Sequence, residues 1–404
     1  MNITKLELIN FRNYKKKNFD NFSNLNIIIG KNGIGKTSII EAIYLGSLAK
    51  SFKTNNELSI IKNNEEYFRI KIHYFDYFPK KTLEVFLDKN GKKTKINSKM
   101  QRKLSDFISQ YRIIMLSPDE LKLIKASPNT RRNYLNIQIS QLHKEYLHYL
   151  NNYNNLIKNK NDFLKKLMLN SNLDQRYLDI VDEKIVEEGI KIYNYRKKYI
   201  DEINKYINDI FINYVKGEKI YIDYISDYKI NNKEKILNEL KKNRKKEINI
   251  GMTSFGIHRD DYEFMHNENN SKEYSSQGLQ KLIVLAMKLS EVKIFVNNYG
   301  IYPILLLDDL FSELDEKNRN NIFKSLDKEI QIFITTTDLK NINKNIKNKA
   351  KIYNLDEKEW KNGRIWSKWY TSSWRFRCRK KKTWYVYRYN RCERITSFSL
   401  GNCW

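Results

Sequence analysis

A glycine-rich segment near the start of the chain has the residue types and the spacing of a phosphate-binding loop. Its eight residues fit the pattern GxxxxGK[ST], follow a short apolar run and precede a helical pattern. In such a loop, consecutive backbone N–H groups surround a phosphate, the lysine neutralises the β- and γ-oxygens, and the hydroxyl residue binds Mg²⁺. The segment therefore predicts a site for ATP and Mg²⁺, formed by Gly30, Lys31, Asn32, Gly33, Ile34, Gly35, Lys36 and Thr37.

A second segment is a short apolar run that ends in two carboxylates. Residues 304–307 read Ile-Leu-Leu-Leu, and Asp308 and Asp309 follow directly. This ending is common among buried strands, but together with the phosphate loop it predicts a Walker B strand. Asp308 is then placed to hold the metal through water and Asp309 to polarise the attacking water as a general base, with Lys36 as the third catalytic residue. Asp315, further along, fits a helix N-cap at least as well as an active role.

A third segment, residues 275–281 with the sequence SSQGLQK, places a small polar residue and a glycine just before a helix. By itself this arrangement fits simple helix capping as well as function. A phosphate loop, a long insertion, a Ser-x-Gly turn and an acidic strand follow one another here in the order found in ABC-type ATPases. This resemblance to ABC-type ATPases implies that Ser276 and Gly278 contact the γ-phosphate of ATP bound to the opposite subunit, in a homodimer that forms head to head around two ATP molecules.

The elements that must position these residues form an α/β pattern with a helical insertion. Apolar periodicity predicts strands at 3–8, 25–29, 68–75, 83–88, 303–307, 331–335 and 350–355, and helices from 37, at 277–296 and at 315–326. Between them lies a long stretch rich in Tyr, Asn, Leu, Ile and Lys at helical spacing, with few Gly or Pro residues. The predicted fold class is α/β, an ABC-type P-loop ATPase head (1–111 and 251–365) with an inserted compact helical lobe (112–250).

The chain is strongly basic, with 75 Lys and Arg against 47 Asp and Glu and a net charge of +28. This balance favours a polyanionic partner, DNA first, although an AT-rich genome also enriches Lys. No run of 18 apolar residues and no secretory leader pattern is present, so we expect a cytoplasmic protein without a membrane partner. With no aromatic stacking platform, duplex backbone contact is favoured over single-strand binding. The candidate contacts are Arg131, Arg132, Lys241, Lys242, Arg244, Lys245 and Lys246.

The last 45 residues differ in composition from the rest of the chain. They contain all three cysteines and all six tryptophans, and residues 361–404 hold twelve Lys and Arg against Glu393 alone. We interpret residues 366–404 as a segment translated in another reading frame. The alternatives are a basic aromatic arm for nucleic acid, or metal binding by Cys378 and Cys392, whose spacing is poor for zinc.

Several segments resemble the RecF family of SMC-like ABC-type ATPases over about residues 1–365. They are LINFRNY (8–14), the phosphate loop with the IIEAIY helix, AKSFKT (49–54), LSPDELKLIKASPNTRRNYLN (116–136), SFGIHRDD (254–261), SSQGLQK, LLLDDLFSELD (305–315) and IFITTTD (332–338). The resemblance implies a weak DNA-dependent ATPase of replication and recombinational repair. It would clamp duplex DNA near single-strand gaps and work with RecO and RecR, and indirectly with RecA, whose loading it would help.

Details of this resemblance bear on the chemistry. Thr335 to Thr337 stand where many ABC ATPases have a γ-phosphate-sensing His, which implies slow hydrolysis and a switch more than a motor. Leu279 replaces the Gln common in the signature turn, and His258 is either structural or a nucleotide or DNA contact. The rival classes are an SMC-like chromosome organiser, a nuclease head, and a DNA-binding protein that holds ATP without hydrolysing it. The first requires a long heptad arm and the second an extra acidic metal cluster, and the sequence shows neither.

Overall fold

The computed structural model describes residues 2–75, 81–170, 172–229, 232–310, 313–339 and 342–356. The chain divides into two compact units, Met1–Gly363 and Arg364–Trp404, and every described residue belongs to the first. The hypotheses on residues 366–404, including metal binding by Cys378 and Cys392, therefore concern positions outside the described residues. Within the described ranges, no helix has both the length and the apolar character that a membrane span requires.

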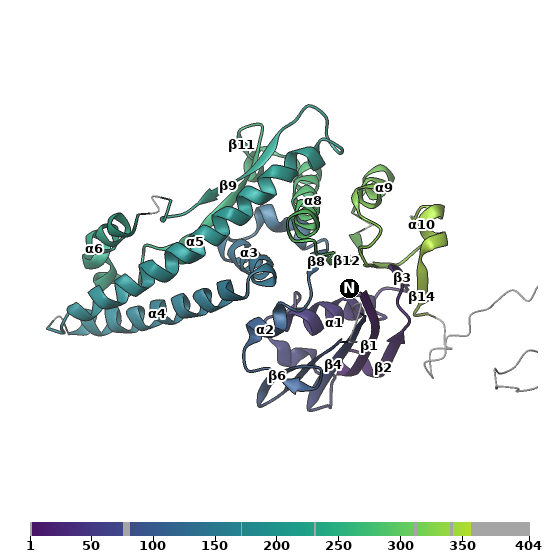
Figure 1. The fold of residues 1–404 in the computed structure, drawn as a ribbon, viewed down its shortest axis with the longest axis horizontal. Helices are drawn as coiled ribbons and strands as arrows, with labels where there is room; N and C mark the ends of the chain where they lie inside the picture. The colour runs from purple at the N-terminus through teal and green to yellow at the C-terminus, as the bar shows by residue number, and fades with distance from the viewer. Residues whose placement is uncertain are drawn as a thin grey trace, which may run out of the picture. The chain divides into compact units, whose positions relative to one another are not determined.

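A five-stranded, all-parallel sheet forms the centre of this unit, in the order β14-β3-β13-β12-β8 (Figure 1). Because its strands are parallel, their carboxyl ends lie at one edge of the sheet, where such sheets bind ligands. Strand β3 leads into the phosphate loop, and β12 ends at Asp308 two strands away. The strands are β3 Leu25–Ile29, β8 Ile113–Leu116, β12 Ile304–Asp308, β13 Ile332–Thr336 and β14 Lys351–Asn354.

Both faces of the parallel sheet are buried, which explains why its strands read as continuous apolar runs. Successive side chains point to opposite faces, so Ile28 and Leu306 belong to one hydrophobic core, whereas Ile27 and Leu307 belong to the other. The first core also contains α1 and an antiparallel sheet, and the second contains α8 (Gln277–Lys293) and the helical lobe. The central sheet thus joins the two halves of the unit.

Helix α1 (Lys36–Leu48) is covered by a six-stranded antiparallel sheet in the order β2-β1-β4-β5-β6-β7. Strands β1, β4 and β5 confirm the predicted ones, but β2 was not predicted. Its sequence YKKKNFD carries three consecutive lysines because it is an edge strand that faces solvent, so it lacks the apolar alternation. The strands are β1 Asn2–Phe11, β2 Tyr14–Asp20, β4 Tyr67–Phe75, β5 Lys81–Asp88, β6 Gly91–Ile96 and β7 Lys99–Met100.

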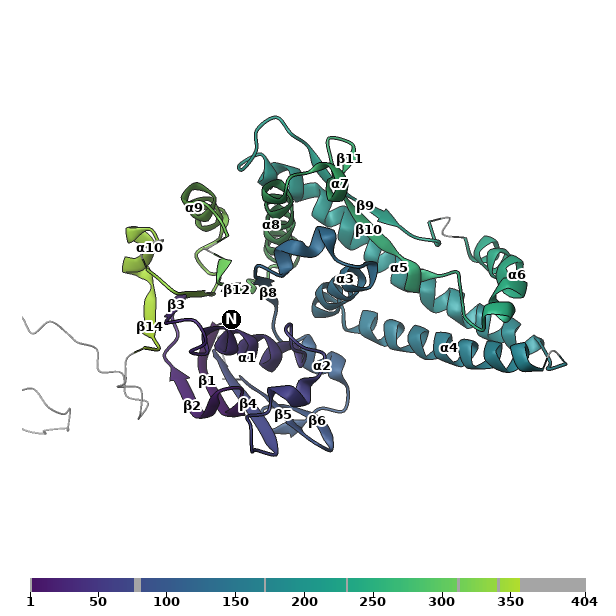
Figure 2. The same ribbon diagram turned by 180° about the vertical axis from the view of Figure 1, so that it is seen from behind.

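The helical lobe is built on two long helices that run side by side, α4 and α5 (Figure 2). Helix α5 has 36 residues and is about 54 Å long. It packs against α4 and α6 instead of extending from the lobe as a coiled-coil arm. Tyr146 and Tyr153 are fully buried, which confirms that the apolar face of α4 is core. At Gly189 a β-carbon would lie 2.4 Å from the buried Tyr228 ring. The helices are α3 Pro128–Leu142, α4 Lys144–Leu169, α5 Arg176–Phe211 and α6 Lys233–Ile250.

Two strands lie in the span that the sequence pattern predicted as helical. Strand β8 extends the parallel sheet past the expected boundary at 111, and β9 alternates buried and exposed residues beside β10 and β11. Both are short, four and six residues, and so are easily lost among helical patterns. The remaining elements are α2 Leu104–Ile108, β9 Ile220–Ile225, β10 Asp261–His266, β11 Asn269–Asn270, α7 Ser271–Tyr274, α9 Glu316–Ser325 and α10 Lys344–Lys349.

Candidate nucleotide-binding site

The phosphate loop, residues 30–37, connects β3 to α1 as the sequence predicted. Its backbone requires glycine at Gly33 and Gly35, whose φ angles are 81° and 109°. Gly35 also has a close neighbour, since a β-carbon there would lie 2.8 Å from the hydroxyl of Tyr14. That hydroxyl donates to the Gly35 carbonyl at 3.2 Å, so the first antiparallel strands help to hold the loop.

Lys36 is buried and its ammonium lies across the loop. Its Nζ donates to the carbonyl of Gly30 at 2.7 Å and to that of Lys31 at 3.1 Å. Burial lowers the pKa of Lys36, and the charges of Asp309 and Asp308 act in the opposite direction. The loop and the acidic strand therefore lie close enough for their charges to interact.

Asp308 is buried at the carboxyl end of β12 and is held by two hydroxyl groups. Thr335 lies opposite it on β13, and its Oγ1 donates to Asp308 Oδ1 at 2.7 Å. The same Oγ1 accepts the N–H of Asp309 at 2.9 Å. Burial raises the pKa of Asp308, whereas hydrogen bonds from Thr335 and Thr37 and the charge of Lys53 oppose the rise. Thr37 and Asp308, the two predicted metal ligands, are thus in contact.

This pair fits Mg²⁺. A hydroxyl and a carboxylate supply the oxygen ligands that this ion prefers, and a nearby dication would offset the cost of burying the Asp308 charge. The next residue, Asp309, has a φ of 49°, in the left-handed region that non-glycine residues rarely adopt. Strain of this kind is concentrated at functional sites. The strand end thus presents two adjacent carboxylates, one turned into the sheet and one on a strained backbone.

The signature turn, residues 275–281, begins α8. Ser276 is the N-cap, since its Oγ accepts the N–H of Leu279 at 3.3 Å, so the capping interpretation is confirmed. Ser276 and Gly278 are exposed, and a β-carbon at 278 would meet nothing within 4 Å. In the described part of the chain, the hydrogen bonds of Ser276 remain within its own helix. The structure therefore brings together the loop and Asp308, and leaves the signature turn open at the surface.

Sequence reasoning missed a second layer of residues beneath the phosphate loop. Arg12 forms a two-pronged ion pair with the buried Glu41 of α1, with N–O distances of 2.8 and 2.7 Å. Ser51 donates to the same carboxylate at 2.6 Å and accepts the N–H of Lys53. This chain of contacts holds the segment that carries Lys53, whose charge opposes the rise of the Asp308 pKa. The segments LINFRNY and AKSFKT carry part of the family resemblance, but only the fold shows that they are linked through Glu41.

A second unpredicted contact lies at the far edge of the loop. Asp356, just after β14, accepts the N–H of Lys31 at 3.2 Å. Its charge also opposes the lowering of the Lys36 pKa. Because the two residues are 325 positions apart, no local sequence signal points to this contact.

Several other predicted residues have structural roles. Arg131, a DNA candidate, is buried and forms a bidentate ion pair with Asp261 at 2.7 and 2.6 Å, so it is not a surface contact. Arg244 is paired with Asp179 and Asp182. His258 bonds to the Tyr153 hydroxyl, and burial lowers its pKa to about 4, so it is a neutral structural residue. Asp315 caps α9 by accepting the N–H of Asn318.

A phosphate loop, a Walker B carboxylate and a Ser-x-Gly turn on a parallel sheet define a P-loop ATPase head of the ABC type. The chain matches the RecF/RecN/SMC N terminal domain over residues 2–361. The DNA replication and repair protein RecF of Staphylococcus carnosus is 32% identical, with 89% of this chain and 99% of that protein covered. The RecF of Clostridium perfringens is 37% identical, with 90% and 99% covered.

Solved structures agree. Two structures of the recombination mediator protein RecF in the RecFOR pathway, one with ATP and one with ATPrS, are each 31% identical to this chain. Their TM-scores are 0.79 and 0.78, and the matches cover 84% and 85% of this chain and 93% and 94% of those chains. The chain belongs to the RecF family. The predicted fold class and the predicted resemblance are both confirmed.

Proposed function

We propose that the protein is an ATP-dependent DNA-binding protein of replication and recombinational repair. It binds ATP·Mg²⁺, forms a head-to-head homodimer and clamps duplex DNA near single-strand gaps, where it works with RecO and RecR to load RecA. The observation that carries the proposal is the meeting of Lys36, Thr37 and Asp308 at one sheet edge, together with an exposed signature turn. Its relatives, which are DNA replication and repair proteins and a recombination mediator, support the cellular role.

Each residue of the site has a distinct task in this proposal. The loop amides and Lys36 bind the β- and γ-phosphates, and Thr37 and Asp308 hold Mg²⁺, which neutralises phosphate charge when bound. Asp309 orients a water for attack on the γ-phosphorus and takes its proton, while the bond to the β-phosphate oxygen breaks to give ADP and phosphate. Ser276 and Gly278 of the partner subunit complete the site at the γ-phosphate.

Slow turnover is part of the proposal, because the protein acts as a switch. Thr335, at the position of the sensing His in many ABC ATPases, uses its hydroxyl to hold Asp308 and the Asp309 N–H. It thus stabilises the strand end and has no ring nitrogen to offer the γ-phosphate. Binding of ATP closes the dimer, and hydrolysis resets it.

The test is binding of labelled duplex and gapped DNA to the full chain, followed by fluorescence anisotropy with and without ATP·Mg²⁺. We expect tight binding only with ATP, and its loss in Lys36→Ala, which removes the loop cation, and in Ser276→Arg, which blocks the partner contact. Equal binding with and without ATP would refute the nucleotide-gated clamp. ATP binding without any turnover in the wild type would instead support a protein that holds ATP without hydrolysing it.

A further inference from the structure

Helix α6 has two faces of different chemistry. Its inner face is buried against α4 and α5 through Ile236, Leu240 and Glu247. Its outer face carries two rows of exposed lysines at i and i+4, Lys241 with Lys245 and Lys242 with Lys246. A surface helix that presents four cations in adjacent rows is suited to a repeating array of negative charge.

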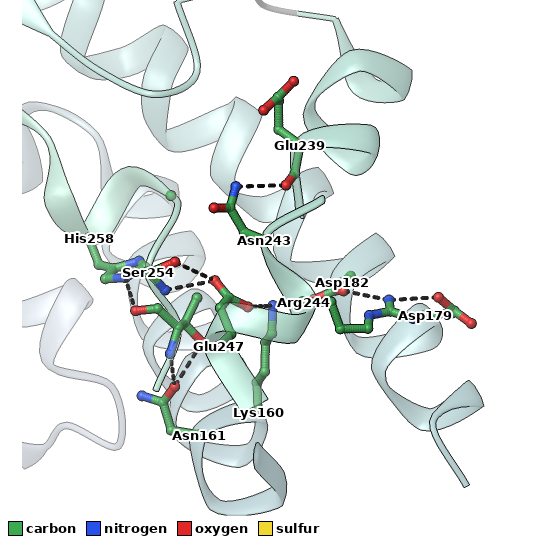
Figure 3. A network of polar contacts seen from close by, with 12 residues as sticks. Lys160, Asn161, Asp179, Asp182, Glu239, Asn243, Arg244, Glu247, Ser254 and His258 are labelled. Atoms are coloured by element: carbon green, nitrogen blue, oxygen red, sulfur yellow. Dashed lines mark hydrogen bonds and ion pairs between the residues drawn. The ribbon is translucent and has the colours of Figure 1, made fainter. Parts of the chain in front are cut away.

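Two cations that point inward, Lys160 of α4 and Arg244 of α6, are neutralised by carboxylates, as Figure 3 shows. A buried ion network joins Lys160 of α4 to Asp182 of α5 at 2.7 Å and to Glu247 of α6 at 2.9 Å. Arg244 of α6 adds ion pairs to Asp179 and Asp182 at 2.7 and 3.0 Å. The network thus fixes α6 to both long helices, and its two cations face three carboxylates within the lobe.

The loop after α6 is attached to the same network. The N–H of Ser254 donates to Glu247 at 2.7 Å, and Asn161 of α4 accepts both the N–H and the hydroxyl of Thr253 at 2.8 Å. Helix α6 is therefore held along its length and just beyond its end. A rigid mounting of this kind lowers the entropy lost when the outer face binds a partner.

The outward lysines, by contrast, are largely without counter-ions. Lys242 pairs with the half-buried Glu239, whereas Lys241, Lys245 and Lys246 form no ion pair with any described residue. Lys165 of α4 extends the positive surface, since its side chain lies 3.3 Å from the place that a β-carbon at Gly251 would take. The result is a cluster of unneutralised positive charge at this end of the lobe.

We propose that the outer face of α6 is the surface by which the helical lobe contacts the phosphate backbone of duplex DNA. The inference rests on the proposed function and specifies where its DNA contact lies. Successive lysines in a row are about 6 Å apart along the helix axis, close to the spacing of about 7 Å for two nucleotides along one strand. Lysine is a point charge that reads no base edge, so the contact positions the duplex without selecting sequence.

The test compares three full-length proteins in a salt titration of duplex DNA binding with ATP·Mg²⁺. One is the wild type and one changes Lys241, Lys242, Lys245 and Lys246 to Gln, a residue that keeps helix propensity. The matched control changes four exposed lysines elsewhere, Lys99, Lys103, Lys344 and Lys349, to Gln. All three keep the basic residues beyond 360, and the two variants have the same net charge, so general electrostatics cannot separate them.

Each lost phosphate contact lowers the slope of log K against log salt by about 0.9, so the α6 variant should lose about 2 to 4 in slope. The control should lose less than about 1, and both variants should keep ATP-dependent dimerisation. Equal slopes and affinities in the two variants would overturn the inference and leave the proposed function intact. A wild type that does not bind duplex DNA would refute the proposed function and the inference with it.

Discussion

The buried ion network of the helical lobe yields a quantitative prediction for Lys160→Met. Methionine fills a similar volume but leaves Asp182 and Glu247 without the cation that both contact at less than 3 Å. Lys160, Asp182 and Glu247 are each no more than 2% exposed, so water cannot replace the lost charge. Breaking a buried ion pair from one side costs about 3 to 5 kcal/mol. We expect this cost to fall mainly on α6, which Glu247 ties to the lobe.

Hydrogen exchange measures the effect locally. A loss of 3 to 5 kcal/mol should speed exchange of the slowest amides of α6 by about two to four powers of ten. The control is Lys165→Met, a change of the same residue type five positions later, where the lysine is exposed and should cost within about 0.5 kcal/mol. Adding Glu247→Gln to Lys160→Met removes one stranded charge and should recover part of the loss. Unchanged α6 protection in Lys160→Met would refute the assignment of the network as the attachment of α6.

Three further predictions test other parts of the structure. Burial raises the pKa of Glu291 to about 7, so its protonated native form contributes stability below about pH 4.5 that is lost as the pH rises to about 7. As the pH rises over this range, the free energy of unfolding of Glu291→Gln should therefore increase by about 3 kcal/mol relative to that of the wild type. A stability difference between the two proteins that stays constant with pH, measured by thermal unfolding, would contradict this. Gly189→Ala should destabilise by about 1 to 3 kcal/mol, because the new methyl group meets Tyr228; a more stable variant in urea unfolding would show that the helix has room. Gln280 donates to the carbonyls of Ser271 and Ser275 at 2.8 and 3.1 Å. Because a carboxylate cannot donate these hydrogen bonds, Gln280→Glu should distort the signature turn and weaken ATP-driven dimerisation about tenfold. The affinity of the single subunit for ATP, measured by fluorescence titration, should stay unchanged. Weakened ATP binding in this variant would mean that the turn acts on its own subunit.

The parts of the site that could be predicted are contiguous in sequence. The phosphate loop, the strand ending at Asp308 and the turn at Ser276 each carry their chemistry within a few residues, and apolar runs beside them reveal the strand or helix that holds them. Their order along the chain then indicates the fold class. The central strands could be predicted for a similar reason, because a strand buried on both faces reads as an unbroken apolar run.

The parts that could not be predicted depend on partners distant in sequence. Thr335 bonds to Asp308 only because β13 pairs with β12 in one particular register. Arg131 was expected at the surface because its partner, Asp261, lies 130 residues away. The basic run of α6 shows the same limit, since the sequence does not reveal that Arg244 points inward while its neighbouring lysines point outward.

The most direct test of the proposed mechanism mixes two inactive variants. In a head-to-head dimer, each ATP lies between Lys36 of one subunit and Ser276 of the other. Lys36→Ala and Ser276→Arg alone should each abolish ATP turnover, but a mixed dimer contains one site with both residues intact. An equimolar mixture should recover up to about a quarter of wild-type turnover, since half of randomly paired dimers are mixed and each has one working site of two. A mixture as inactive as its components would contradict the shared site.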